Sequence, residues 1–247
     1  MAQPLPAETR YWSRSDDRQR VVNALFNRAA CHYDRICRLM SCGSGQRYRR
    51  DALRRAGVQR GMCVLDVGIG TGLLAREILD LTGPSGRVVG IDPSPAMMAI
   101  AHEQLAVGLV QGIGDRLPFG DASFDFVTMG YALRHVADLD AAFDEYRRVL
   151  RAGGRLLLLE ITPPESTLGL ALARTYFGTL VPLVVRIATR DSAAADLMRF
   201  FWDSINLCVP PDAVLASLRR AGFAAARRSV VHGVFSEYTV GTTHSHE

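Results

Sequence analysis

The chain has 247 residues, of which 48% are hydrophobic and 22% charged, with a formal net charge of +4. This length and balance fit one soluble globular domain with a sizeable core. The five cysteines are odd in number and lack C-x-x-C spacing, and the N-terminus has no secretory h-region. Free thiols in a reducing cytoplasm are therefore expected, and a metal site has no support.

The basic side chains other than histidine are all arginines, because the sequence contains no lysine, and they are concentrated before residue 60. Such a run could form an electrostatic footprint for nucleic acid. However, it lacks interleaved stacking aromatics, and Asp16, Asp17 and Asp51 interrupt it. We interpret the run as a solvated helix face and expect no nucleic-acid partner.

Residues 1–20 are polar and contain prolines, which predicts an N-terminal arm that is poorly ordered or packs late. Residues 21–247 are expected to form a single domain, in which residues 21–57 read as a helical cap with an apolar stripe. Alternating strands and helices follow, so we expect a mostly parallel sheet covered on both faces. Strands are expected near 62–67, 87–91, 107–110, 124–129 and 154–161. Helices are expected near 72–82, 95–105, 138–150 and 210–220, with a final strand hairpin over 229–241.

The alternation stops between residues 162 and 210, where the chain is very apolar. A transmembrane helix is disfavoured because Arg174, Pro182 and Arg186 interrupt the segment 168–187. We expect a helical lid over an apolar pocket instead. Peripheral contact of this lid with a bilayer stays open.

The segment 64–72 is the most informative in the chain, because a short apolar strand runs directly into a glycine-rich turn and a helix. Gly68, Gly70 and Gly72 allow positive φ and let a ligand approach the main chain. The helix start is a natural seat for a polar or anionic group. Asp92 ends the next apolar run, where an acid can bind both hydroxyls of a ribose. The pattern therefore predicts a nucleoside-binding site.

Four further segments, residues 25–34, 130–136, 148–156 and 159–160, join the glycine loop in resembling one family, the ubiquinone/menaquinone-biosynthesis C-methyltransferases. The resemblance spans roughly residues 25–240. It implies an α/β, Rossmann-like class I methyltransferase fold with a mostly parallel seven-stranded sheet and a helical lid. It also implies S-adenosylmethionine as methyl donor and a lipophilic small molecule methylated at carbon.

The same resemblance implies roles for residues around the cofactor. Asp92 would bind the ribose, Met97 would pack on the adenine, and Asp115 would lie beside the adenine edge. The full expected set is Asp66, Gly68, Gly70, Gly72, Asp92, Pro93, Met97, Gly114, Asp115 and Tyr131. Ile113 departs from the family, which has a polar Asp or Asn there, so the adenine amino group loses a side-chain acceptor. This loss would cost about 0.5–1.5 kcal/mol.

The predicted catalytic residues are Arg134, His135 and Tyr33. The resemblance implies that Arg134 orients or activates a substrate hydroxyl. His135 stands where the family has Asn, and its ordinary pKa near 6.5 makes it a candidate base at neutral pH. The alternative is that His135 hydrogen-bonds a main-chain carbonyl. Tyr33 would contact the cofactor or the substrate, and it would line the substrate pocket with Phe200, Phe201 and Trp202.

We expect the substrate to be a prenylated quinol of the menaquinone or ubiquinone type. A specialised branch acting on a prenyl diphosphate, an aromatic ring or a heterocycle is the first alternative. A non-catalytic nucleoside-binding protein is the second. A nicotinamide dehydrogenase is disfavoured because Leu73 replaces the glycine that its loop needs, and no RNA-binding module is visible. A homodimer stays open.

Overall fold

The computed structural model describes residues 11–12 and 15–241. Its helices include α1 (Ser15–Met40), α2 (Gly45–Ala56), α3 (Leu73–Thr82), α4 (Pro95–Gln104), α5 (Leu139–Val149), α6 (Thr167–Thr175), α7 (Val181–Thr189), α8 (Ser192–Leu207) and α9 (Pro211–Arg220). A 3-10 turn, η1, covers Leu133–His135, and a π-helical turn, η2, covers Tyr176–Leu180. The strands are β1 (Cys63–Val67), β2 (Arg87–Asp92), β3 (Gly108–Gln111), β4 (Phe124–Gly130), β5 (Leu150–Ile161), β6 (Arg227–Val231) and β7 (Phe235–Gly241).

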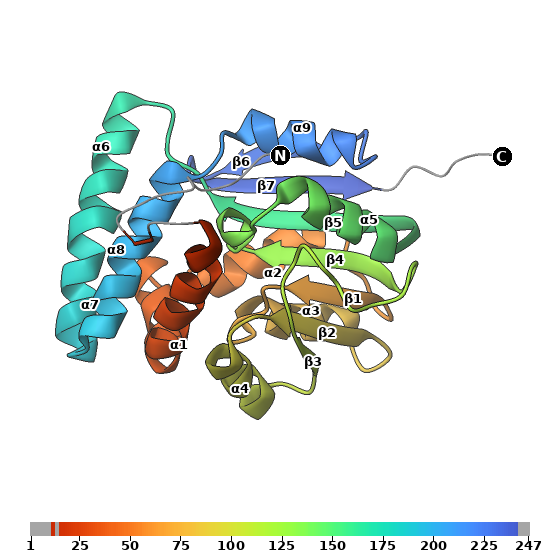
Figure 1. Ribbon diagram of the computed structural model, residues 1–247, viewed down its shortest axis with the longest axis horizontal. Coiled ribbons are helices and arrows are strands. Elements are labelled where there is room, and N and C mark those ends of the chain that lie inside the picture. The colour runs from red at the N-terminus through yellow and green to blue at the C-terminus, as the bar shows by residue number, and fades with distance from the viewer. Residues whose placement is uncertain (1–10, 13–14, 242–247) are drawn as a thin grey trace.

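The seven strands form one sheet in the order β3-β2-β1-β4-β5-β7-β6 (Figure 1). The first five strands along the chain are parallel to one another, whereas β7 runs antiparallel to both β5 and β6. The strand order reverses between β1 and β4, since β2 and β3 lie on one side and β4 and β5 on the other. Such a reversal places a ligand crevice at the carboxyl ends of the strands.

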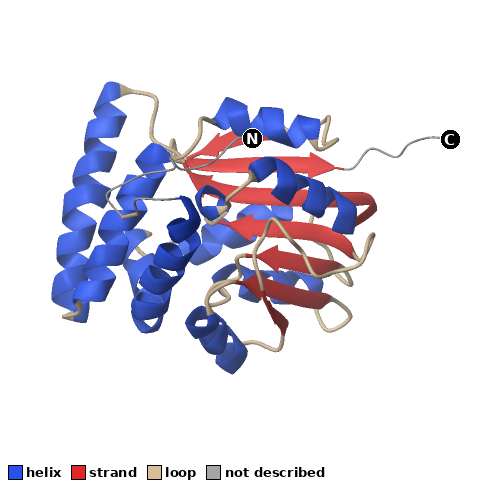
Figure 2. Cartoon of the chain, in the orientation of Figure 1, coloured by secondary structure: helices blue, strands red, loops and turns tan. Residues whose placement is uncertain are grey.

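Helices cover both faces of the sheet (Figure 2). On one face α5 and α9 bury side chains such as Phe143 and Leu218 against β1, β4 and β5. On the other face α2 and α3 bury Leu53 and Ile78 against the same strands. Because both faces are covered, the strands read as continuous apolar runs rather than as alternating patterns.

A third apolar cluster lies beyond the strand ends, among α1, α7 and α8. In Figure 1 these helices and α6 stand together at one side of the sheet. Phe200 and Ile36 are buried within this cluster, together with Trp12. The helical cap is therefore a packed layer with its own core, joined to the sheet at its ligand-binding edge.

The structure confirms the predicted fold, and the predicted strands and helices lie within a few residues of the observed ones. β5 is the main exception, because it begins at Leu150 rather than near residue 154. The boundary of the N-terminal arm was also wrong. Residues 15–20 already belong to α1, and Trp12 is 5% exposed. The remaining residues of the predicted arm lie outside the described part of the chain.

The predicted lid region contains α6, η2, α7 and α8. Residues Thr167–Thr189 form one helical stretch with mean hydropathy 1.6, which is long and apolar enough to cross a membrane by length and composition. Only 22% of its most apolar window is buried. The stretch packs through α7 on α8, and its remaining face carries exposed leucines.

Candidate active site

The glycine loop follows β1 and turns beneath the end of β2. The main-chain N–H of Gly68 donates to the Ile91 carbonyl at 2.8 Å. Gly68, Gly70 and Gly72 have φ values of +70°, +56° and +88°, which favour glycine. A Cβ at Gly70 would meet nothing within 4 Å, whereas one at Gly72 would lie 2.4 Å from Leu105. Gly70 thus presents bare main chain to open space, and Gly72 permits close packing of α3 on the end of α4.

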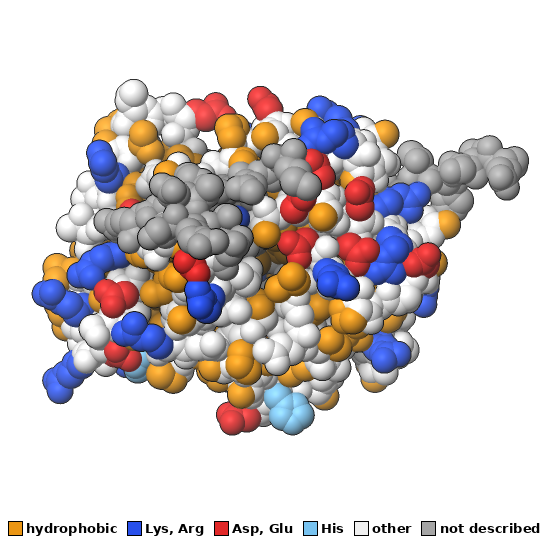
Figure 3. Space-filling model, viewed as in Figure 1, with side chains coloured by type: hydrophobic (Ala, Val, Ile, Leu, Met, Phe, Trp, Pro, Cys, Tyr) orange, Lys and Arg blue, Asp and Glu red, His pale blue; other side chains and the backbone are white. Residues whose placement is uncertain are grey.

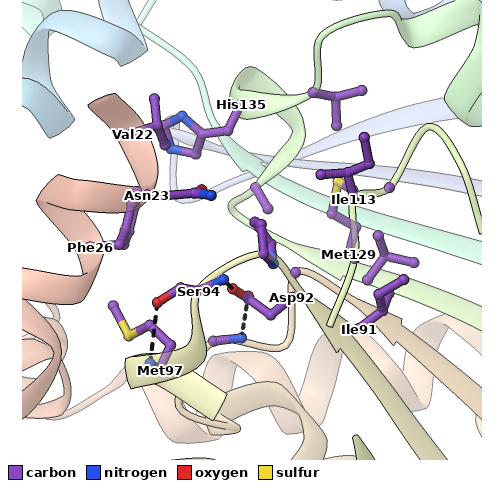
Figure 4. A pocket seen from close by; sticks show the side chains of 18 of the residues that line it. Val22, Asn23, Phe26, Ile91, Asp92, Ser94, Met97, Ile113, Met129 and His135 are labelled. Carbon is purple, nitrogen blue, oxygen red and sulfur yellow. Dashed lines mark hydrogen bonds between the residues drawn. The ribbon is translucent and has the colours of Figure 1, made fainter. Parts of the chain in front are cut away.

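Two adjoining cavities open at this edge of the sheet. The first is lined by the glycine loop, the ends of β2 and β4, the loop after β3, and one side of α1. Figure 4 shows Val22, Asn23 and Phe26 of α1 facing Ile91, Ile113 and Met129 of the sheet edge across this space. None of these α1 residues was predicted, because no local motif marks the side of a helix that faces a cavity.

Asp92 ends β2 in the wall of the first cavity. Its carboxylate accepts hydrogen bonds from the main-chain N–H groups of Gly70 and Ser94, each at 2.8 Å. These two donors hold the carboxylate at the glycine loop (Figure 4). Burial raises the pKa of Asp92 to about 6, and the two hydrogen bonds oppose that rise. An ionised carboxylate held in this way can accept the two hydroxyls of a ribose.

The loop after β3 and the start of α4 form the wall where the adenine is expected. Pro93, Met97, Gly114 and Asp115 all line the first cavity, together with Ile113. A Cβ at Gly114 would lie 2.8 Å from the Tyr146 hydroxyl, so this position accepts only glycine without a shift. The residues present therefore fit an adenosine: an acid for the ribose, an apolar side for the base, and main chain free of side chains.

The second cavity lies on the other side of the glycine loop. It encloses about 240 Å³, against about 100 Å³ for the first. Its walls come from α1, α2, α3, η2, α8 and the β6–β7 hairpin, and they include Cys37, Tyr48, Ile161, Phe177, Phe201 and Phe235. The lining is mostly apolar and aromatic, with Arg47, Arg49 and Arg55 at one side.

Tyr33, Gly68, Gly70, Gly130 and Tyr131 line both cavities, so these residues form the junction. Tyr131 adopts a φ of +61°, which is costly for a residue with a side chain. Its N–H donates to the Leu159 carbonyl at 2.7 Å, and its own carbonyl accepts from Arg134 at 2.9 Å. These bonds hold the strained turn that carries Tyr131 to the junction.

Arg134 lies outside both cavities. Its side chain is 0% exposed and forms an ion pair at 2.5 Å with Glu160, which is also buried. It donates to Ser204 at 3.0 Å, and its guanidinium lies 4.3 Å above the ring of Phe201. The structure therefore places Arg134 as an internal tie between β5, α8 and the Tyr131 turn, and not in contact with either ligand space.

His135 lines the first cavity only. Its ring stacks on Phe200 at 5.5 Å and meets the edge of Phe26 at 5.4 Å. Neither ring nitrogen has a hydrogen-bond partner among the described residues, so the alternative contact with a main-chain carbonyl does not occur. Burial, with the charges of Arg134 and Arg18, lowers the pKa of His135 well below its ordinary value.

Three other predicted residues lie away from their expected places. Phe200 and Trp202 line neither cavity, because Phe200 packs among the cap helices and Trp202 stacks on Phe177 at 6.2 Å. Phe201, between them, faces the second cavity. Asp66 lines the second cavity rather than the first. One of its oxygens accepts from Thr128 at 2.7 Å, the other has no partner, and burial raises its pKa to about 7.

The sequence is similar to those of known methyltransferases. A model of the ubiE/COQ5 methyltransferase family matches residues 13–246. The ubiquinone/menaquinone biosynthesis C-methyltransferase UbiE of Pseudomonas paraeruginosa is 35% identical over 209 residues, covering 82% of this chain and 80% of that protein. The demethylmenaquinone methyltransferase of Deinococcus radiodurans is 34% identical over 223 residues, covering 88% and 91%.

Solved structures share the fold at lower identity. A Thermotoga maritima protein described as a possible histamine N-methyltransferase has a TM-score of 0.63 at 20% identity, covering 89% of this chain and 99% of that one. The [4+2]-cyclase SpnF has a TM-score of 0.60 at 16% identity, covering 98% and 99%. These likenesses show the fold alone. With the family match and the fitted nucleoside site, they lead to one conclusion: the chain belongs to the ubiE/COQ5 methyltransferase family and is an S-adenosylmethionine-dependent methyltransferase.

Proposed function

We propose that the protein methylates a ring carbon of a lipophilic quinol with a prenyl tail. The observation that carries this proposal is the pair of cavities meeting at Tyr33, Gly68, Gly70, Gly130 and Tyr131. One cavity has the acid and glycine main chain for an adenosine, and the other is larger and mostly apolar. The relatives named for ubiquinone, menaquinone and demethylmenaquinone methylation support the choice of a quinol.

S-adenosylmethionine supplies an electrophilic methyl group on a sulfonium. The chain has to align this methyl with a ring carbon and exclude water from the line between them. With the donor bound, the acceptor hydroxyl would lose its proton to water, and the ring carbon would then take the methyl group while the electrons of the carbon–sulfur bond stayed on sulfur. Loss of the ring proton restores the aromatic ring. Tyr33 and Tyr131, at the junction, are placed to align the two reactants.

His135 does not fit the role of base in this reaction. It lines only the first cavity, and a pKa well below 6.5 makes it a weak proton acceptor. We propose that its neutral ring, stacked on Phe200, closes the donor side against water. Replacing His135 by Phe should therefore leave more than about half of the turnover. Replacement by Ala should lower turnover several-fold by opening the cavity, as cofactor titration and product assays would show.

A prenyl diphosphate is the second candidate acceptor, because three arginines line the second cavity. Two of them already have acidic partners. Arg55 pairs with Glu237 at 2.6 Å, and Arg47 lies 3.8 Å from Asp51 with a side chain that is 90% exposed. Of these three arginines, only Arg49 has no acidic partner among the described residues. One guanidinium suits a single oxyanion better than a diphosphate, so the quinol is favoured.

The test is methyl transfer from labelled S-adenosylmethionine to three acceptors under reducing conditions. These are a prenylated demethylmenaquinol, a prenylated demethoxy-benzoquinol and geranyl diphosphate. Label in a quinol carbon is expected, with none in the diphosphate. Transfer to the diphosphate alone would overturn the proposal in favour of the second candidate. Calorimetry with S-adenosylmethionine in the same buffer confirms that the protein assayed binds its donor.

A further inference from the structure

Arg49 is the one cation of the second cavity without an acidic partner among the described residues. It lies on α2, half-buried, and its Nε is fully buried without any hydrogen-bond partner. A buried guanidinium nitrogen without a partner is costly, and natural proteins satisfy most such groups. An unsatisfied donor in the wall of a ligand cavity indicates that a ligand supplies the missing acceptor.

We propose that Arg49 is the oxyanion site of the second cavity and binds the phenolate oxygen of the methyl acceptor. This inference rests on the proposed function, since it gives the site its ligand. The guanidinium stabilises the negative charge that activates the ring carbon, which is the role that the sequence resemblance assigned to Arg134. Arg134 is unavailable for it, because it lies outside both cavities, where Glu160 and Ser204 accept from its Nη1 and Nε and its partnerless Nη2 is enclosed by protein.

The charge of Arg49 reaches the junction between the cavities. Burial raises the pKa of the Tyr33, Cys37 and Tyr131 side chains, and the positive charge of Arg49 opposes that rise in all three. Tyr33 and Tyr131 line both cavities, so a hydroxyl beside them feels the same charge. The proton released from the acceptor hydroxyl passes to water, and the oxyanion left behind pairs with Arg49 as the methyl carbon–carbon bond forms.

Arg49→Gln tests the proposal, with Arg54→Gln as the matched control, because Arg54 lies on the same helix but lines neither cavity. Arg49→Gln should lower kcat about a hundredfold, the usual effect of removing one oxyanion donor, with the Kd for S-adenosylmethionine unchanged. The remaining activity should rise with pH, since hydroxide then supplies the phenolate that Arg49 no longer stabilises. Arg49→Lys should restore part of the rate. Arg54→Gln, a change at an exposed side chain outside both cavities, should change kcat less than about twofold.

A second readout needs no methyl transfer. The probe is 4-nitrophenol, whose phenol and phenolate forms absorb at different wavelengths. Bound to the wild-type protein, its pKa should fall by about one unit or more, as expected beside an unpaired cation, and this shift should vanish in Arg49→Gln. An unshifted probe in the wild type, or equal shifts in both proteins, overturns the Arg49 proposal. Failure of quinol methylation with a normal probe shift would overturn the proposed substrate alone.

A separate surface carries a second inference. One side of the helical stretch Thr167–Thr189 exposes Leu168, Leu172, Leu183 and Ile187, which are 70%, 62%, 44% and 67% exposed. Their spacing in multiples of about one helical turn places them along one stripe. Arg174 and Arg186 on the same stretch, and Arg190 directly after it, are exposed and form no ion pair among the described residues. Figure 3 shows apolar and basic side chains together at this edge of the molecule.

We infer that this stripe, Leu168 to Ile187, docks on the surface of an anionic bilayer. Apolar side chains that alternate with unpaired arginines match acyl chains beneath negative headgroups. A second copy of the chain fits less well, because a two-fold contact through this stripe would bring the same arginines together. Phe177, between the two halves of the stripe, lines the second cavity, so docking would put the acceptor space beside the source of a lipophilic substrate.

Vesicle sedimentation without any quinol tests this inference. The wild type should bind vesicles of 70% phosphatidylcholine and 30% phosphatidylglycerol, and bind pure phosphatidylcholine at least tenfold more weakly. Leu168→Ser with Ile187→Ser should lower binding at least tenfold, whereas Leu207→Ser, an exposed leucine outside the stripe, should not. Absence of wild-type binding overturns the inference. So does a concentration-dependent dimer that the double variant abolishes.

Discussion

The walls of the two cavities are formed by different kinds of structural element. The first is formed mainly by loops that follow parallel strands, where glycines and an acid have fixed spacings along the chain. The second adjoins the same glycine loop, but most of its walls come from helices and a hairpin that lie far apart along the chain. The donor side is therefore constrained by the sheet, while the acceptor side can change with the packing of the cap.

The largest expected effect comes from Arg134, which lies outside both cavities but holds the Tyr131 turn that lines both. Arg134→Met leaves the Glu160 carboxylate buried and unpaired, which should lower the free energy of unfolding by about 3–5 kcal/mol. Denaturation in urea measures the loss. The double variant Arg134→Met with Glu160→Leu should recover much of the lost free energy of unfolding, because no buried charge is then left without a partner. Arg199→Met, which breaks an exposed pair with Asp196, should cost less than about 1 kcal/mol.

Asp92 lines the first cavity but not the second, so its replacement should affect binding of the methyl donor alone. Asp92→Ala should weaken S-adenosylmethionine binding about tenfold to a hundredfold, as expected for charge-assisted hydrogen bonds of about 1.5–3 kcal/mol. Binding of 4-nitrophenol should be unchanged. Calorimetry with each ligand measures both. An equal loss of affinity for both ligands would mean that the two cavities are not independent binding sites.

The same carboxylate predicts a pH dependence. Burial raises the pKa of Asp92 to about 6, so protonation begins to remove the ribose acceptor as pH falls through 6. Donor affinity should be flat above pH 7 and decline below 6. The contribution of Asp92 to folding has the opposite sign. The folded state binds this proton more tightly than the unfolded state, so that contribution rises as pH falls from about 6 to 4. Asp92→Asn should remove the pH dependence of donor binding.

The smallest effect is a gain. Ile113 lines the first cavity with 40% of its surface exposed, at a position where the sequence resemblance predicts a polar side chain. Ile113→Asn should supply an acceptor for the adenine amino group and tighten donor binding about two- to tenfold, from about 0.5–1.5 kcal/mol. Ile113→Ala serves as the control for lost bulk. If the two variants bound the donor with equal affinity, the side chain at position 113 would make no hydrogen bond to the adenine.

The sheet and the donor loop could be predicted because their signals are local. Apolar runs at regular spacing, Gly68 to Gly72, and Asp92 each lie within a short segment whose geometry the backbone fixes. The fate of Arg134 could not be predicted in this way, because its partner Glu160 is 26 residues distant along the chain. Its resemblance-based role placed it at the substrate, while tertiary packing placed it inside the protein.

The acceptor side shows the same limit more strongly. Phe200, Phe201 and Trp202 follow one another on α8, so their directions differ by about 100° per residue and only some can face the cavity. Composition alone cannot choose among them. The arginine run was interpreted as a solvated face, and Arg47 and Arg54 fit that interpretation. Arg49 does not, because the rotation of α2 against the cap decides which arginine turns inward.

Helix α1 lines the first cavity, and its contacts also bear on the rate at which the enzyme can exchange its donor. Its Asn27 accepts a hydrogen bond from Ser94 at 2.7 Å, Arg18 donates to the carbonyls of Arg134 and Val136 at 2.9 Å, and Asp34 accepts from Thr71 at 2.5 Å. One helix is thus fastened to loops after three strands, over the space that holds the donor. We expect exchange of spent for fresh donor to involve movement of α1 away from at least one of these loops. Motions of this kind take microseconds to milliseconds and often limit turnover.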